Sequence, residues 1–202
     1  AARFPILTIG SGPANSIRGA AFLTGMTDAL VADVGGTSTD FGMIVNGFPR
    51  ESAYAVDIGG VSTNFRMPDV LALPLGGGTI GRSGTLGSPE VQLGPDSVGY
   101  RLPQEALVFG GPTATLSDAL VAAGRGQIGG SPLPDSSLDL LARAMSASDD
   151  AVAEGVDRMK VGRADVPLIV VGGGSMLIPD SLPGVSKVLR PENFDVANAI
   201  GA

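Results

Sequence analysis

The segment Asp33–Asp40, with the sequence DVGGTSTD, most constrains what this chain can fold into. Ala29–Val34 is predicted to be a buried strand that leads into it, and an apolar run follows from Phe41 to Val45. Gly35 and Gly36 let the backbone turn with its N–H groups exposed, because no Cβ blocks a close approach. The pattern therefore predicts two strands joined by a glycine-rich hairpin turn.

This turn has the chemistry of a phosphate site. Consecutive backbone N–H groups that point the same way form an anion-binding nest, and the hydroxyls of Thr37, Ser38 and Thr39 add donors. Asp33 and Asp40 can hold a hydrated magnesium ion or orient a water molecule. No Gly-Lys-Ser/Thr follows, so this is not a Walker loop, and a strand rather than a helix follows, so it is not a Rossmann fingerprint. The alternative is a plain hairpin stabilised by Asp and Thr side chains.

A second glycine-rich turn, Gly172-Gly173-Gly174-Ser175, follows the apolar run Leu168–Val171. A strand that ends in such a turn lets a flat group lie directly on the backbone. Glycine-rich strand ends are common, so this turn gains its meaning from occurring together with the first one.

Hydrophobic periodicity and turn residues predict the other elements. We expect helices over residues 15–24, 116–123, 136–160 (with a break near 147–149) and 195–202, and strands over 53–58 and 167–171. Residues 68–130 show no simple core pattern, so we expect an irregular insertion there within one lobe spanning 1–202.

The chain contains one internal echo. Residues 33–44 (DVGGTSTDFGMI) match residues 57–68 (DIGGVSTNFRMP) at 7 of 12 positions. The second copy has Val61 in place of Thr37 and Asn64 in place of Asp40, so it lacks a hydroxyl and a carboxylate. We therefore expect a different role for it, or none.

Composition excludes several classes of function. The net charge is −7 and the 13 basic residues form no cluster, which argues against nucleic acid and an anionic membrane surface as partners. The absence of Cys and His means that any metal must be held by oxygen, which suits magnesium. No apolar run reaches the 18 or so residues of a membrane span, and the first residues do not resemble a signal peptide. We expect a cytoplasmic protein.

Two further groups of residues are weaker candidates. Arg66, Asp69 and the glycines around Gly77 could face a substrate, or could form a surface turn. Thr115 and Asp118 open a predicted helix, where capping is the favoured interpretation and a nucleotide or metal contact is the alternative.

The two glycine-rich turns, in this order, resemble the second half of the actin, sugar-kinase and heat-shock ATPase superfamily. Further segments narrow the resemblance to the hydantoinase A and 5-oxoprolinase family. They are residues 11–25 (SGPANSIRGAAFLTG), 57–78 (DIGGVSTNFRMPDVLALPLGGG), 94–111 (GPDSVGYRLPQEALVFGG) and 170–179 (VVGGGSMLIP), with Arg190-Pro191-Glu192. Together they cover nearly the whole chain.

The resemblance implies an α/β lobe of ribonuclease-H-like, actin-like architecture, with a mixed sheet and flanking helices. It implies an enzyme that uses ATP with Mg²⁺ to phosphorylate a carbonyl or amide oxygen, so that water can open a cyclic amide of the hydantoin or 5-oxoproline type. Carried over by position, the family's second phosphate loop corresponds to Asp33, Gly35, Gly36, Thr37, Thr39 and Asp40, with Asp33 as a metal ligand. Its adenosine loop corresponds to Gly172, Gly173, Gly174 and Ser175.

The family's first phosphate loop has no counterpart in this chain, which starts without Met. We therefore expect a fragment whose partners are the N-terminal lobe of the same protein and a hydantoinase B-type subunit, and which is inactive alone. Two alternatives remain open. One is another phosphotransferase of the superfamily, such as a sugar or acid kinase, against which residues 57–78 and 94–111 argue. The other is a scaffold lobe without turnover.

Overall fold

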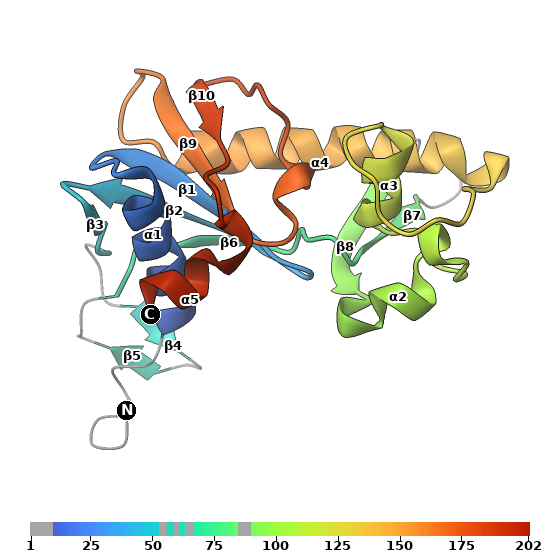
Figure 1. The fold of residues 1–202 in the computed structure, drawn as a ribbon, viewed down its shortest axis with the longest axis horizontal. Coiled ribbons are helices and arrows are strands. Elements are labelled where there is room, and N and C mark those ends of the chain that lie inside the picture. Colours follow the sequence, from blue (N-terminus) through green and yellow to red (C-terminus); the bar gives the residue numbers. More distant parts are fainter. Residues whose placement is uncertain (1–9, 53–55, 59–60, 64–66, 85–89) are drawn as a thin grey trace.

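The structure is a computed structural model that describes residues 10–52, 56–58, 61–63, 67–84 and 90–202. Its chain forms a main body built on a mixed sheet and a smaller second body, and one long helix runs along both (Figure 1). The α/β class with flanking helices is therefore the one that the sequence predicts.

Six strands form the main sheet, in the order β10-β9-β1-β2-β3, with β6 also paired to β2. Strands β1, β9 and β10 run parallel to one another, whereas β2 runs antiparallel to β1, β3 and β6. Their bounds are β1 Ala29–Val34, β2 Thr39–Val45, β3 Phe48–Pro49, β6 Leu71–Leu73, β9 Val166–Val171 and β10 Val185–Leu189. The predicted strands at 29–34 and 167–171 are confirmed, and the strand predicted over 41–45 starts two residues earlier.

Both faces of the sheet are covered, because alternate residues of a strand point to opposite sides. Leu30, Ala32 and Val34 belong to the core shared with α4 (Leu138–Met159). Ala29 and Val31 belong to a second core on the opposite face, under α1 (Ser11–Thr24) and α5 (Ala197–Gly201). Burial on both faces explains why the first four residues of β1 are an unbroken apolar run.

Helix α4 is continuous, so the predicted break near 147–149 is wrong. Its apolar stripe keeps one face buried past this point, as the exposure of Met145 and Val152 shows at 3% and 2%. Asp149, the last residue of the predicted break, accepts two hydrogen bonds from Arg125, of 2.7 and 2.5 Å. The helix starts at Leu138 rather than 136, after a 3₁₀ turn, η4, over Asp135–Ser137.

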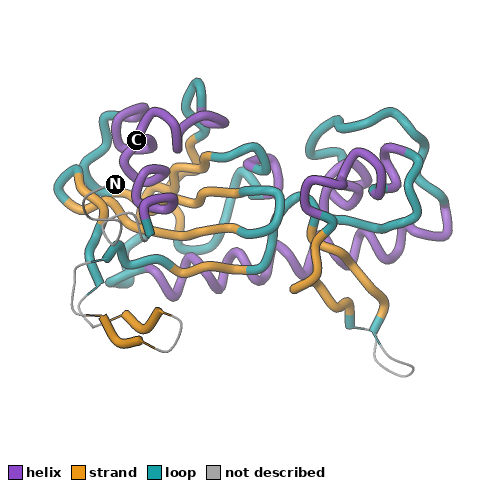
Figure 2. Tube along the Cα trace, turned by 90° about the horizontal axis from the view of Figure 1, so that it is seen from below, coloured by secondary structure: helices purple, strands orange, loops and turns teal. Residues whose placement is uncertain are grey.

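The second body contains an antiparallel hairpin, β7 (Thr79–Ser83) with β8 (Val91–Ser97), and the short helices that follow it (Figure 2). The helical segments are η2 Gly99–Arg101, α2 Leu102–Glu105, η3 Leu107–Phe109 and α3 Leu116–Ala122. Within the range 68–130, β6 thus joins the main sheet, and β7 to α3 form the second body against α4. Its strands are short and rich in glycine and polar residues, so they lack a clear alternating pattern.

Thr115 caps α3, as predicted. The Thr115 hydroxyl accepts a hydrogen bond from the Asp118 amide, and Asp118 accepts from the Thr115 amide at 2.7 Å. The other oxygen of Asp118 accepts from the amide of Val108 at 2.7 Å. This buried carboxylate is therefore occupied in holding the second body together.

The echo at residues 57–68 also starts as a hairpin, but outside the main sheet. Strands β4 (Val56–Ile58) and β5 (Val61–Thr63) form a two-stranded sheet of their own. Asp57 pairs with Ser62, five residues on, whereas Asp33 pairs with Asp40, seven residues on. The two copies therefore differ in register.

Among the described residues, no helix combines the length and the apolar character that crossing a bilayer requires.

We expect the core under α4 to dominate stability. Phe41 is fully buried in it, next to Gly155, while Phe22 on α1 is 78% exposed. Phe41→Ala should lower the free energy of unfolding by about 3–5 kcal/mol, because it leaves a cavity. Phe22→Ala should change it by less than about 0.5 kcal/mol. Urea unfolding monitored by circular dichroism measures both, and equal losses in the two variants would contradict this description of the core.

Candidate functional site

The turn between β1 and β2 is closed by its own backbone and leaves its tip accessible. The Gly35 amide donates to the Ser38 carbonyl at 2.8 Å. The Thr39 hydroxyl is buried and donates to the Leu75 carbonyl at 2.6 Å, so it anchors the turn. Gly36 and Thr37 at the tip are exposed, which leaves this part of the turn open to an anion.

The segment Gly76–Gly78 supports the turn from one side. The Gly77 amide donates to the Gly35 carbonyl at 3.1 Å, and the Gly78 amide donates to the Gly36 carbonyl at 2.7 Å. A Cβ at Gly76 would lie 2.5 Å from the Thr37 nitrogen, so only glycine allows this contact. Gly77 is buried, and its carbonyl accepts from the Ser117 amide at 2.9 Å. It holds the turn in place rather than facing an open space.

The second glycine-rich turn packs against the other side of the hairpin. The Gly174 amide donates to the Val34 carbonyl at 2.8 Å. Gly172 has a φ of 87°, and a Cβ on it would lie 2.5 Å from Oδ1 of Asp33. The two turns meet because β1 and β9 are adjacent parallel strands, whose carboxyl ends share one edge of the sheet.

Two carboxylates lie at the base of the turn. Asp33 and Asp40 are directly opposite each other on β1 and β2, so their side chains share one face of the sheet. Burial, together with the negative charge of Asp33, raises the pKa of Asp40 above its usual value. Oδ2 of Asp33 accepts a 2.5 Å hydrogen bond from the Ser16 hydroxyl of α1.

These residues suit a metal ion that arrives with phosphate oxygens. No group of three or more Asp, Glu, His or Cys gathers in the part of the chain that the structure describes, so the protein offers no metal cage there. Mg²⁺ is commonly held by one or two carboxylates, waters and substrate phosphates. Asp33 and Asp40 beside an open backbone turn fit that pattern. Within the second turn, Ser175 Oγ is fully buried and has no hydrogen-bond partner, so its hydroxyl is an unused donor.

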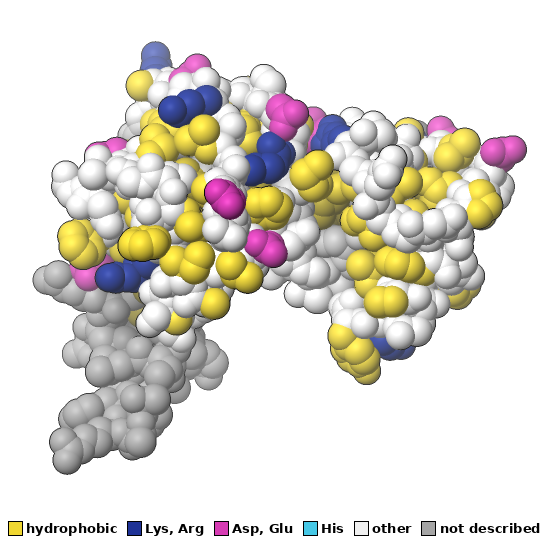
Figure 3. Space-filling model, in the orientation of Figure 1, with side chains coloured by type: hydrophobic (Ala, Val, Ile, Leu, Met, Phe, Trp, Pro, Cys, Tyr) yellow, Lys and Arg dark blue, Asp and Glu magenta, His cyan; other side chains and the backbone are white. Residues whose placement is uncertain are grey.

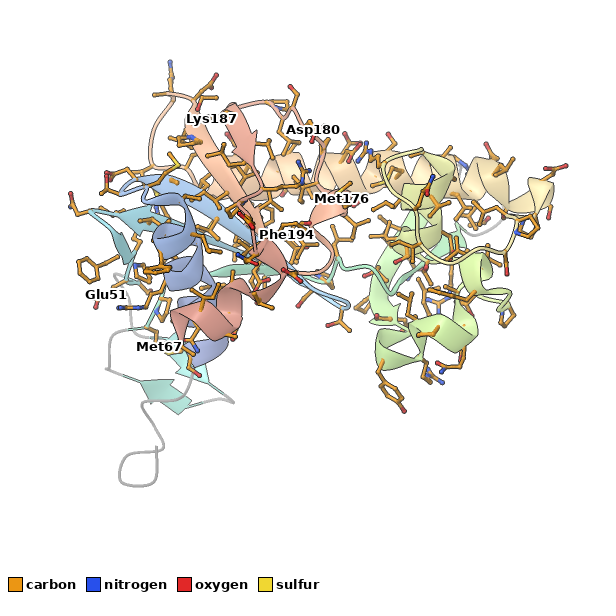
Figure 4. The ribbon with its side chains drawn as sticks, viewed as in Figure 1. Glu51, Met67, Met176, Asp180, Lys187 and Phe194 are labelled. Carbon is orange, nitrogen blue, oxygen red and sulfur yellow. The ribbon has the colours of Figure 1, made fainter. Side chains whose placement is uncertain are left out.

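A pocket of about 310 Å³ follows the second turn, between the main sheet and the second body. Its lining comprises Gly124, Arg125, Met176, Ile178, Pro179, Asp180 and Arg190. Figure 4 labels Met176 and Asp180 on the segment that runs from β9 towards β10, and Figure 3 shows the surface hollowed between the two bodies. The hydrogen bond from Arg125 to Asp149 raises the pKa of Arg125.

The structure thus brings together most of the predicted site residues, but not all. Gly172 to Ser175 meet the hairpin. Asp69 precedes β6, at the end of this strand that points away from the hairpin turn. There it forms an ion pair with Arg50 at 2.8 Å. Arg66 lies outside the described residues. Sequence patterns gave no sign of Ser16 or Arg125, because each reaches its partner only through the tertiary fold.

Comparisons with known proteins bear on the family and the fold of the chain. A family model described as hydantoinase/oxoprolinase matches residues 1–129. The nucleotide-free structure of acetone carboxylase, from work on ATP-dependent acetone carboxylation, is similar with a TM-score of 0.70 at 20% identity, over 94% of this chain and 31% of that one. The ATP-dependent caprolactamase from Pseudomonas jessenii is similar with a TM-score of 0.70 at 22% identity, over 94% of this chain and 32% of that one. None of the curated proteins compared with the chain matches it.

The likeness to these two structures shows the fold, and confirms the predicted α/β lobe of actin-like architecture. The chain spans about a third of the length of either structure. The family match covers more than half of the chain and includes the hairpin turn. The chain therefore belongs to the hydantoinase/oxoprolinase family.

Proposed function

We propose that this chain is the nucleotide-binding lobe of an ATP-dependent amidohydrolase that opens a small cyclic amide of the hydantoin or 5-oxoproline type. The observation that carries the proposal is the contact between the hairpin turn and the Gly172–Ser175 turn at the carboxyl ends of β1 and β9. A phosphate chain and an adenosine could lie on these two backbones at the same time. An α/β sheet binds ligands at this edge as a rule.

Each part of the site has a distinct task in the proposal. The backbone amides of the exposed residues Gly36 and Thr37 would hold phosphate oxygens. Asp33 would hold Mg²⁺, and Asp40 beside it would share the ion or orient a water molecule. The second turn would hold the adenosine, and the adjoining pocket offers Arg125 and Arg190 to its base. When bound, ATP would supply the phosphoryl group that turns an amide oxygen into a better leaving group.

The stability cost of the carboxylate pair supports a functional role. Asp40 is partly buried opposite Asp33, and its raised pKa means that the folded state disfavours its ionised form. A plain structural hairpin has no need for two like charges at one position. Sites that bind cations or perform acid–base work commonly retain such unfavourable pairs.

The names of the two structural neighbours suggest two candidate classes of substrate. One neighbour is named for a lactam and the other for the carboxylation of a ketone, and both are named as ATP-dependent. We favour the amide for this chain. A carboxylase is the second candidate, because activation of an oxygen by ATP serves both reactions.

We propose that the full catalyst requires the N-terminal lobe of the same protein and a B-type subunit. With these supplied, ATP hydrolysis should depend on a cyclic amide. Hydrolysis that instead depends on a ketone and bicarbonate would favour the carboxylase, and a phosphorylated product that survives would favour a kinase.

The isolated chain should bind Mg²⁺–ATP weakly, since half of the cleft is supplied by another lobe. Asp33→Ala should weaken this binding by at least about tenfold, because it removes the proposed metal ligand. The matched control is Asp157→Ala, an exposed aspartate on α4. Titration calorimetry compares the three proteins. Equal heats for wild type and Asp33→Ala would remove the hairpin from the site.

Gly36→Ala tests the backbone of the turn. A Cβ at Gly36 meets no atom within 4 Å, so the variant should unfold at the same temperature as wild type. Its methyl group would enter the space assigned to a phosphate, and ATP affinity should fall. Gly162→Ala is the control, since its Cβ is also free of neighbours and lies on an exposed loop. Unchanged affinity in Gly36→Ala would argue against phosphate binding at the tip.

Asp40→Asn should stabilise the ligand-free protein at neutral pH. Because folding raises the pKa of Asp40, the stability linked to its protonated form is present below the unfolded value of 3.8 and is lost as pH rises through the higher folded value. The advantage of the variant should therefore be largest at pH 7 and shrink as the pH approaches 3.8. Urea unfolding at a series of pH values measures it, and a gain that grows towards low pH would reverse the sign of this account.

A further inference from the structure

The C-terminal helix reaches the carboxylate of Asp33 through two side chains. The side-chain amide of Asn198, on α5, donates to the Ser16 hydroxyl at 2.9 Å. The Ser16 hydroxyl, on α1, donates to Oδ2 of Asp33 at 2.5 Å. Asn198 also donates to the Gly12 carbonyl at 2.9 Å. Both protons of its amide group are therefore used.

This arrangement fixes the direction of the hydroxyl. Ser16 has one hydroxyl proton and accepts from Asn198, so that proton is left for Asp33. A serine inside a helix commonly donates back to the carbonyl four residues earlier, which for Ser16 is that of Gly12. Asn198 already donates to this carbonyl. It thus takes one of the two acceptor positions of that carbonyl, while the hydroxyl proton of Ser16 goes to Asp33.

The helix that carries Asn198 is docked without room for adjustment. A Cβ on Gly19 would lie 1.9 Å from the Ala197 carbonyl, and a Cβ on Gly201 would lie 1.9 Å from the Asn15 carbonyl. Helices α1 and α5 therefore touch backbone to backbone, side by side in Figure 1.

The approach to α5 is tied to the second turn as well. The Gly172 amide donates to the carbonyl of Phe194 at 2.9 Å, and Figure 4 labels Phe194 on the segment that leads into α5. Gly172 also lies close to the other oxygen of Asp33, because a Cβ there would lie 2.5 Å from Oδ1. Asp33 as a whole stays partly exposed, and both of its oxygens have a neighbour that α5 or its approach contacts.

We propose that Asn198 is a positioning residue, which acts through Ser16 to orient the Asp33 carboxylate for the metal-bound nucleotide. The proposal rests on the proposed function, since Asp33 is the metal ligand only in that reading. It assigns to α5 a task beyond packing. The helix sets the orientation of a carboxylate on a strand that it does not adjoin in sequence.

The test compares Asn198→Ala, Ser16→Ala and the double variant with Ile200→Ala, which removes packing from α5 at a side chain that is 38% exposed. Titration calorimetry measures binding of ATP with Mg²⁺ and of ATP with EDTA. Asn198→Ala and Ser16→Ala should each weaken Mg²⁺–ATP binding by roughly 10- to 100-fold, and leave metal-free binding within about twofold. The double variant should be no weaker than Ser16→Ala, because Asn198 acts through that hydroxyl.

A ligand-free measurement examines the network itself. Asn198 is exposed, but its bond to the Ser16 hydroxyl is partly buried. In the wild type the amide proton in that bond should exchange with water more slowly than it does in Ser16→Ala. If Asn198→Ala does not fold, Ser16→Ala and this exchange measurement carry the test.

The outcomes separate the two proposals. Additive losses in the double variant, an equal loss with and without Mg²⁺, or a matching loss in Ile200→Ala would overturn the positioning role and leave the proposed function standing. An amide proton of Asn198 that exchanges equally fast in the wild type and in Ser16→Ala would do the same. A wild-type chain that binds no Mg²⁺–ATP would overturn the proposed function, and the positioning role with it.

Discussion

The parallel pairing of β1 with β9 is the constraint on which the rest of the structure depends. Both strands are buried on both faces. One face of each strand packs against α4, and the opposite face packs against α1 and α5. Such a strand cannot shift its register without moving apolar residues out of both cores. Fixed register fixes where each strand ends, and so places the turn after Val34 against the turn after Val171. The candidate site follows from sheet packing before any polar residue is considered.

Glycine makes the resulting contacts possible. The turns approach so closely that a Cβ on Gly76, Gly172 or Gly174 would lie under 3 Å from the neighbouring segment. Backbone amides and carbonyls bond across these contacts in place of side chains. In the two turns, Gly36 at the hairpin tip and Gly173 have open space where a Cβ would be, so a ligand could lie there. Glycines that look alike in the sequence thus divide into supports, such as Gly77, and binding positions, such as Gly36.

The same arrangement places two negatively charged side chains next to each other. Asp33 and Asp40 stand opposite each other at the edge of the sheet, and burial, together with the charge of Asp33, raises the pKa of Asp40. Ser16 satisfies one oxygen of Asp33, and the tightly docked α5 supports Ser16 through Asn198. A bound cation would offset the negative charge of these carboxylates, and the backbone amides of the turn would hold the phosphates that come with it. In the proposed function the lobe forms one side of a nucleotide cleft. This agrees with its size, because the chain spans about a third of the length of each structural neighbour.

The local features of the protein were determined by its sequence. Apolar runs placed β1 and β9, Thr115 and Asp118 defined a cap, and the DVGGTSTD turn marked the candidate site, because these patterns depend on neighbours along the chain. Only the tertiary structure decided the rest. It separated the hairpin at Asp57 from the main sheet, paired Asp69 with Arg50, and joined Asn198 to Ser16 across 182 residues. Those outcomes depend on how strands pair and helices dock, and no periodicity in the chain records contacts between residues so far apart.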